Sequence, residues 1–218
     1  MARRFKGSGR SPQDPDSLSQ RAKREGWRSR SVYKLEEIDL AERLLKPGAF
    51  VLDLGAAPGA WSQYAARRVG EKGRVIATDI LPMAGLTGVE FVQGDFREEP
   101  VVARIVALVA GGQVDVVLSD MAPNLSGVDG IDQPRSMILA ELAFDMAERV
   151  LKRDGAALIK LFQGAGFQAG FQTRFGARFE QFVAASRRRF ARVKLWKPEA
   201  GRSHSPELYL LAKGFGLV

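Results

Sequence analysis

A glycine-rich turn carries the clearest chemical signal in the sequence. It lies in Val51-Leu-Asp-Leu-Gly-Ala-Ala-Pro-Gly-Ala-Trp61, where an apolar run contains Asp53 and is followed by Gly55 and Gly59. Glycine lets a backbone approach a bound molecule closely, and Pro58 suits the first turn of a helix. Dinucleotide enzymes use G-x-G-x-x-G, whose bare N–H groups hold a pyrophosphate. An acidic residue here repels a pyrophosphate, so the pattern disfavours a dehydrogenase and favours a cationic or zwitterionic ligand.

Two more carboxylates follow the next two predicted strands. Asp79 can accept hydrogen bonds from the ribose hydroxyls of a nucleoside, and Asp95 can accept a hydrogen bond from the amino group of adenine. One such Asp is more simply a helix cap, but three at successive strand ends indicate a nucleoside site. A nucleoside joined to a zwitterionic, cationic group describes S-adenosylmethionine (SAM). The predicted SAM-binding residues are Asp53, Gly55, Gly59, Trp61, Asp79, Asp95 and Asp120.

The segment after the fourth predicted strand indicates which atom is methylated. It reads Ser119-Asp-Met-Ala-Pro-Asn124 and lacks the Pro-Pro-aromatic signature with which many methyltransferases hold a planar nitrogen. The chain has no cysteine, so attack on a pyrimidine ring by a thiolate is excluded. The expected acceptor is therefore an oxygen.

Lys160 stands inside the fifth predicted strand, in Ala-Ala-Leu-Ile-Lys160-Leu-Phe. A lysine in an apolar strand is costly unless it has a partner, although an edge-strand lysine can extend its ammonium to solvent. Strands four and five are neighbours in the expected fold, so Asp120 and Lys160 are predicted to meet.

The elements that must position these residues alternate between strand and helix. The predicted strands are Phe50–Leu54, Arg74–Thr78, Val89–Gln93, Val114–Ser119, Ala156–Leu161, Ala191–Trp196 and Leu208–Ala212. The predicted helices are Ser19–Ala41, Trp61–Val69, Val101–Val109, Ser136–Leu151 and Gly170–Ala185. Nearly continuous apolar strands indicate a parallel sheet covered on both faces, and the short last connection indicates a closing antiparallel pair. We expect the α/β Rossmann-like methyltransferase fold, with seven strands, one of them antiparallel.

Composition limits the partners and the domain organisation. The 218 residues include 33 Lys and Arg against 25 Asp and Glu, one His and no Cys. This excludes disulfides and thiolate or histidine-rich metal sites, so no metal is expected. The net charge of +8 favours a polyanionic partner. We expect residues 1–20 to be a basic disordered tail and 21–218 a single domain, in a monomeric cytoplasmic protein without a membrane span.

Basic residues concentrate near both ends of the expected domain and predict an RNA-binding surface. They are Arg21, Lys23, Arg24, Arg28, Arg30, Arg187, Arg188, Arg189, Arg192, Lys194, Lys197 and Arg202. Trp27, Tyr33 and Trp196 lie among them, and each either stacks on unpaired bases or packs in the core.

Five stretches together resemble the FtsJ/RrmJ (RlmE) family of ribosomal RNA 2′-O-ribose methyltransferases, over about residues 28–214. They are Arg28-Ser-Arg-Ser-Val-Tyr-Lys-Leu, Asp53-Leu-Gly-Ala-Ala-Pro-Gly, Leu118-Ser-Asp-Met-Ala-Pro-Asn-Leu-Ser-Gly, Ile159-Lys-Leu-Phe-Gln-Gly and Ser205-Pro-Glu-Leu-Tyr. Ala60 replaces the second glycine of the usual Pro-Gly-Gly-Trp, a mild change at a helix start.

The resemblance implies a catalytic tetrad of Lys34, Asp120, Lys160 and Glu207. It also implies SAM as cofactor and a uridine of large-subunit ribosomal RNA, in the peptidyl-transferase region and within the ribosomal particle, as substrate. Lys160 would be either a general base or a cation that stabilises the developing alkoxide. Alternatives are a 2′-O-methyltransferase acting on transfer RNA or an mRNA cap, and a non-catalytic ribosome-assembly factor.

Overall fold

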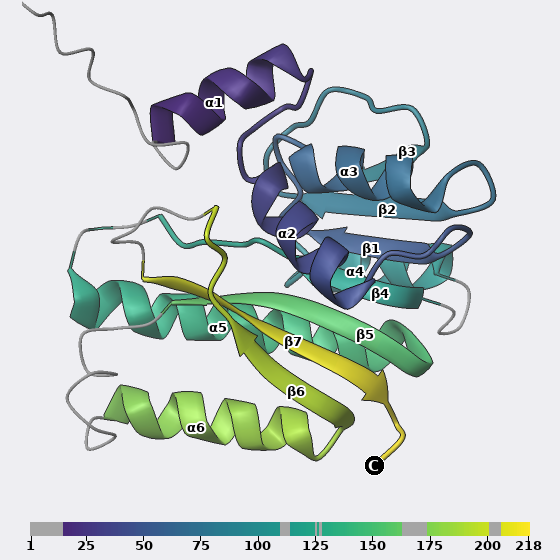
Figure 1. Cartoon of the computed structure of the whole chain (residues 1–218). Coiled ribbons are helices and arrows are strands. Elements are labelled where there is room, and N and C mark those ends of the chain that lie inside the picture. Colours follow the sequence, from purple (N-terminus) through teal and green to yellow (C-terminus); the bar gives the residue numbers. More distant parts are fainter. Residues whose placement is uncertain (1–14, 110–113, 125, 127, 163–173, 201–205) are drawn as a thin grey trace, which may run out of the picture.

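The computed structural model describes residues 15–109, 114–124, 126, 128–162, 174–200 and 206–218 (Figure 1). Within them the chain forms one sheet with helices on both sides. The helices are α1 (Pro15–Arg24), α2 (Val32–Glu42), α3 (Ala60–Val69), α4 (Glu99–Leu108), α5 (Asp129–Val150) and α6 (Arg174–Arg187). The strands are β1 (Phe50–Leu54), β2 (Arg74–Asp79), β3 (Val89–Gln93), β4 (Val114–Ser119), β5 (Leu151–Phe162), β6 (Phe190–Trp196) and β7 (Glu207–Phe215). None of the helices in these ranges is long and apolar enough to cross a bilayer.

The sheet has the strand order β3-β2-β1-β4-β5-β7-β6. The first five strands in that order pair in parallel, whereas β7 runs antiparallel to both β5 and β6. The predicted fold class is confirmed, including the closing antiparallel pair. Because β7 is reversed, its first residues lie beside the last residues of β5, as the pairing of Phe162 with Glu207 shows.

Two hydrophobic clusters lie on the two faces of the sheet, because successive strand side chains point to opposite sides. In β1, Leu52 and Leu54 belong to the cluster under α4, α5 and α6, whereas Val51 belongs to the cluster under α1, α2 and α3. Figure 1 shows α5 and α6 together on one side of the sheet and α2 and α3 on the other. This double cover buries the strands and leaves their carboxyl ends as the place for a site.

The N-terminal segment differs from the single helix predicted for Ser19–Ala41. Residues 25–31 separate α1 from α2, and Gly26 adopts a φ of +73° that ends the first helix. α1 begins at Pro15, inside the tail expected to end at residue 20, because Leu18 and Ala22 form a buried pair one helical turn apart. The composition of residues 1–20 is polar on average, so it gave no sign of these two apolar residues. The rest of the expected tail, residues 1–14, lies outside the described residues.

Two later elements begin well before their predicted first residues. β5 begins at Leu151 rather than Ala156, and α5 begins at Asp129 rather than Ser136. Pro134 lies within α5, where its missing N–H removes one backbone hydrogen bond without ending the helix. The predicted start of α6 at Gly170 lies outside the described residues.

Candidate active site

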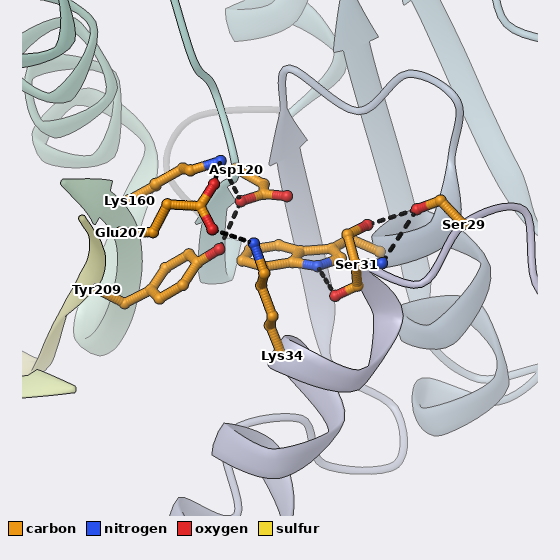
Figure 2. Close-up of polar contacts among 8 residues, drawn as sticks. Ser29, Ser31, Lys34, Asp120, Lys160, Glu207 and Tyr209 are labelled. Atoms are coloured by element: carbon orange, nitrogen blue, oxygen red, sulfur yellow. Dashed lines mark hydrogen bonds and ion pairs between the residues drawn. The ribbon is translucent and has the colours of Figure 1, made fainter. Parts of the chain in front are cut away.

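Four elements converge at the carboxyl edge of the parallel strands. Asp120 directly follows β4, Lys160 lies near the end of β5, Glu207 opens β7, and Lys34 lies in the first turn of α2. Figure 2 shows their side chains pointing toward one another. The structure therefore brings together all four residues that were predicted from positions up to 173 residues apart in sequence.

Glu207 bridges the two lysines. Its Oε2 accepts a hydrogen bond of 2.5 Å from Nζ of Lys34, and its Oε1 lies 2.9 Å from Nζ of Lys160. Nζ of Lys160 also lies 3.2 Å from Oδ1 of Asp120. The result is a chain of alternating charges, Lys34–Glu207–Lys160–Asp120, with two cations and two anions.

Burial and charge act against each other at these residues. Lys160 is only 7% exposed, and this burial lowers the pKa of its ammonium, but the carboxylates of Asp120 and Glu207 outweigh burial and raise that pKa above its ordinary value. Burial likewise raises the pKa of Glu207, but Lys160 and Lys34 outweigh it and hold that pKa at about 2. Glu207 is ionised and Lys160 is charged in the free protein at neutral pH.

Tyr209 is a member of this cluster that the sequence reasoning missed. Its hydroxyl donates a hydrogen bond of 2.6 Å to Oδ1 of Asp120 (Figure 2). Tyr209 stands opposite Lys160 in the β5–β7 ladder and two residues after Glu207, so all three side chains share one face of the sheet. Because alternate residues of a strand share a face, the spacing of two residues between Glu207 and Tyr209 could have indicated that Tyr209 belongs to the cluster.

Trp61, which was predicted to bind the cofactor, is buried beside Tyr209. It is 2% exposed, its ring centroid lies 5.6 Å from that of Tyr209, and its indole N–H donates to the carbonyl of Ser31. Ser31 directly precedes α2. Trp61 therefore connects the start of the Lys34 helix to the strand that carries Tyr209.

Acidic side chains of α2 hold this helix against the rest of the fold. Asp39 is fully buried and accepts hydrogen bonds from α3, while Glu37 and Glu42 face the β6–β7 pair. The partners of Asp39 are Tyr64, Arg68 and the backbone N–H of Leu45. The partners of Glu37 are Trp196 and the N–H groups of Glu199 and Ala200, and those of Glu42 are Arg192, Lys194 and Lys213. These contacts on two sides fix the position of Lys34.

The glycine-rich turn lies beside this cluster, between β1 and α3. Gly55 and Gly59 have φ values of +72° and +104°, which side-chain-bearing residues rarely adopt. A Cβ at Gly55 would lie 2.2 Å from Cγ of Met121, which follows Asp120. Glycine is required here both by conformation and by the close approach of the segment after β4.

Asp53 lies beneath the turn rather than at its surface. It is 1% exposed, its Oδ2 accepts a hydrogen bond of 2.5 Å from Ser62, and its Oδ1 has no hydrogen-bond partner among the described residues. Burial raises the pKa of Asp53 to about 7. This orphaned buried oxygen marks the turn as a place where a nearby cation would stabilise the carboxylate.

The other two predicted cofactor carboxylates occupy the adjacent edge. Asp79 accepts hydrogen bonds of 2.8 Å from the N–H groups of Ala57 and Leu81, which joins the glycine-rich turn to the segment after β2. Asp95 pairs with Arg97, which lowers the pKa of Asp95. Asp53, Asp79 and Asp95 thus lie at the same edge, but each already has a partner within the chain.

The aromatic residues predicted among the basic positions are largely packed. Tyr33 is 3% exposed and belongs to the core, Trp27 contacts Tyr64 and Arg67, and Trp196 donates to Glu37. Packing rather than base stacking accounts for Tyr33. Arg202 lies outside the described residues.

The strand order, the reversed β7 and the glycine-rich turn beside a lysine–carboxylate cluster define a Rossmann-like methyltransferase. The chain belongs to the FtsJ-like methyltransferase family, whose pattern matches residues 27–215.

Relatives that this chain matches over most of their length agree with this assignment. A protein of Stenotrophomonas maltophilia (strain K279a) named ribosomal RNA large subunit methyltransferase E is 53% identical to this chain over 199 residues. The match covers 91% of this chain and 89% of the relative. The corresponding protein of Legionella pneumophila (strain Corby) is 50% identical over 202 residues, covering 93% and 92%. A crystal structure from Plasmodium falciparum, described as a ribosomal RNA methyltransferase, superposes with a TM-score of 0.72 at 26% identity, covering 87% of this chain and 98% of that one.

Proposed function

We propose that this protein transfers a methyl group from SAM to the 2′-hydroxyl of a uridine in large-subunit ribosomal RNA. The observation that carries the proposal is the Lys34–Glu207–Lys160–Asp120 chain of charges beside the glycine-rich turn. The names of the relatives support ribosomal RNA as the substrate. The ribose oxygen, the uridine and the peptidyl-transferase region rest on the family resemblance.

The residues around the turn fit SAM. Oδ1 of Asp53 is buried without a partner, which suits a cationic ligand close to the turn. Ile80 and Leu81, which follow Asp79, are 64% and 58% exposed and offer apolar surface to a flat base. Asp79 would hold the ribose hydroxyls and Asp95 the adenine amino group. When bound, SAM supplies the electrophilic methyl group on a sulfonium.

The chain's own residues then act on the acceptor hydroxyl. In the free protein the raised pKa of Lys160 keeps its ammonium charged. A charged Lys160 would donate a hydrogen bond to the 2′-oxygen and stabilise negative charge on it, and the hydroxyl proton would then leave to water. Asp120 borders the same space and orients Lys160, and Lys34 holds the target nucleotide. A cationic ligand lowers the pKa of Lys160, whereas the carboxylates raise it. Lys160 becomes the general base only if the ligand lowers this pKa enough for the ammonium to lose its proton.

A pH–rate profile separates these two roles of Lys160. Single-turnover methylation by a general base rises with pH through an ionisation that disappears in Lys160→Ala. A cationic Lys160 gives no such ionisation below its pKa, and Lys160→Arg then retains part of the rate that Lys160→Ala loses. A general base contributes about 10²–10⁴ in rate.

The substrate is tested by transfer of labelled methyl groups from SAM to naked ribosomal RNA, large ribosomal subunits, transfer RNA and capped mRNA. We expect incorporation into large-subunit RNA, most in the particle, and recovery of a 2′-O-methyluridine after mapping. Label in a base would overturn the proposed chemistry. If the protein binds the particle but transfers no more label than Lys160→Ala does, the result would instead indicate a non-catalytic assembly factor. We propose further that the protein works as a monomer in the cytoplasm, where such particles are assembled.

A further inference from the structure

Arg28 lies between α1 and α2 and joins three separate segments of the chain. Its Nη1 donates to the carbonyl of Pro58 at 2.9 Å and to that of Ala84 at 2.7 Å, and its Nη2 donates to the carbonyl of Gly85 at 2.8 Å. Pro58 belongs to the glycine-rich turn, and Ala84 and Gly85 belong to residues 80–88, which connect β2 to β3.

Residues 80–88 contain neither helix nor strand, so their carbonyl groups lack the partners that regular structure supplies. Arginine suits this position because its planar guanidinium presents several N–H donors in a fixed fork. One rigid group therefore fixes the distance between the two loops. A lysine ammonium carries its three N–H donors on one nitrogen and cannot reproduce contacts made by two nitrogens in a fixed plane.

The contact is close to the predicted cofactor position. A Cβ at Gly59 would lie 2.9 Å from Nη1 of Arg28 and 2.7 Å from Sδ of Met83, so the turn, the guanidinium and residues 80–88 pack directly together. Asp79 joins the same two loops through the N–H groups of Ala57 and Leu81. Arg28 and Asp79 thus both connect the glycine-rich turn to residues 80–88 through hydrogen bonds.

The backbone next to Arg28 is itself fastened to α3. The N–H of Arg28 donates to Oε1 of Gln63 at 3.1 Å, and Nε2 of Gln63 donates to the carbonyl of Gly26 at 2.8 Å. Residues 25–31 lead directly into α2, which carries Lys34. A shift of the glycine-rich turn would therefore be transmitted to the Lys34 side of the active site.

We propose that Arg28 is a positioning residue for the SAM pocket rather than a phosphate contact of the RNA surface. It holds the glycine-rich turn against residues 80–88 and couples that wall to the helix of Lys34. Its place in a basic segment predicts an RNA-binding cation, but the guanidinium of Arg28 is directed at three backbone carbonyls. The inference rests on the proposed use of SAM.

The test compares SAM and RNA binding in Arg28→Ala, Arg28→Lys and Arg24→Ala, with SAM affinity measured by calorimetry. Arg24 is the matched control, because it is exposed at the end of α1 and belongs to the same basic sequence. For Arg28→Ala we expect SAM affinity to fall at least tenfold, with RNA affinity and its salt dependence within twofold of the parent. Arg28→Lys should recover SAM affinity only in part. Arg24→Ala should show the opposite pattern, with weaker RNA binding and unchanged SAM binding.

Amide hydrogen exchange gives a readout that does not depend on SAM. Arg28→Ala should speed exchange in residues 55–59 and 80–88 while leaving β4 and β5 protected. Unchanged exchange and unchanged SAM affinity, or loss of RNA affinity alone, would overturn the inference. If the parent protein fails to bind SAM, the proposed function fails, and the exchange result still decides whether Arg28 fastens the loops. If Arg28→Ala does not fold, Arg28→Lys carries the same comparison.

Discussion

The hydroxyl of Tyr209 donates a 2.6 Å hydrogen bond to Oδ1 of Asp120, the same oxygen that faces the ammonium of Lys160. Asp120 is therefore held by two donors, one neutral and one charged, from neighbouring strands. Burial first, and then Asp120, raises the pKa of Tyr209 well above its ordinary value, so the phenol remains a donor throughout the working pH range.

Tyr209→Phe removes this donor and preserves the ring that packs on Trp61. A hydrogen bond to a charged group contributes about 1.5–3 kcal/mol, so we expect kcat to fall by roughly tenfold to a hundredfold while SAM affinity is unchanged. Tyr64→Phe is the matched control, because Tyr64 also donates to a carboxylate, Asp39, outside the active site. It should lower the free energy of unfolding and reduce kcat less than Tyr209→Phe does, because Tyr64 reaches Lys34 only indirectly, through Asp39 and α2. Equal kcat in both variants would contradict a role for Tyr209 in orienting Asp120.

Glu207→Gln should change how stability depends on pH. The pKa of Glu207 falls from an ordinary 4.5 to about 2 in the folded protein, so its ionisation stabilises the fold above pH 4.5, and this contribution is lost as the pH falls toward 2. The shift corresponds to at most about 3 kcal/mol. Denaturant unfolding between pH 7 and pH 2.5 should show a smaller loss of stability in Glu207→Gln than in the parent.

The same substitution affects Lys160 through charge. Without the carboxylate of Glu207, the pKa of Lys160 should fall, so any basic ionisation in the pH–rate profile moves to lower pH. We expect Glu207→Ala to be the mildest alanine variant of the tetrad. Glu141→Gln, at the Arg178 ion pair on α5, is the control and should leave the profile unchanged. A Glu207→Ala enzyme as inactive as Lys160→Ala would contradict this ranking.

Gly55→Ala should disable the cofactor turn. Alanine at a φ of +72° is strained by roughly 1–2 kcal/mol, and its Cβ also meets Met121. We expect SAM affinity to fall at least tenfold, with partial recovery in Gly55→Ala/Met121→Ala, where only the steric conflict is relieved. Gly48→Ala is the control, because Gly48 has a φ of +80° and nothing within 4 Å of its added Cβ. It should lose stability and retain SAM binding, as thermal melts and calorimetry would show.

RNA affinity should weaken steeply with salt, and different cations should contribute differently. Lys197 is exposed beyond β6, whereas Arg192 and Lys194 both contact Glu42. A cation that contacts a phosphate contributes about one to the slope of log K against log salt concentration. We expect Lys197→Ala to reduce this slope by about one and Arg192→Ala by less, because Glu42 already compensates Arg192. Filter binding across a salt series measures both, and a flat salt dependence would argue against a phosphate-binding surface.

The sheet, the glycine-rich turn and the meeting of Asp120 with Lys160 could be predicted from sequence because their signals are local. Lys34 and Glu207 carry no such signal, and only the family resemblance added them. An apolar strand, a glycine-rich turn or an isolated lysine is visible within ten residues, and parallel strands then place their carboxyl ends together. Tyr209, the Arg28 contacts and the fixed position of α2 escaped prediction because each depends on a partner distant in sequence. Arg28 illustrates the difficulty, since a cation in a basic segment gives no local sign that its acceptors are backbone carbonyls. Gly26 and the Leu18–Ala22 pair were too short to register as a helix boundary.

The position of β7 between β5 and β6 has a consequence during synthesis. β7 is made after the other strands that the structure describes, yet it fills an internal place in the sheet and brings both Glu207 and Tyr209 to a site whose other members were made much earlier. A nascent chain can pair β1 to β5 but has an incomplete tetrad until residues 207–215 leave the ribosome. The proposed site is thus completed in one step when β7 joins the sheet, and chains that end before β7 should be inactive whatever structure they retain.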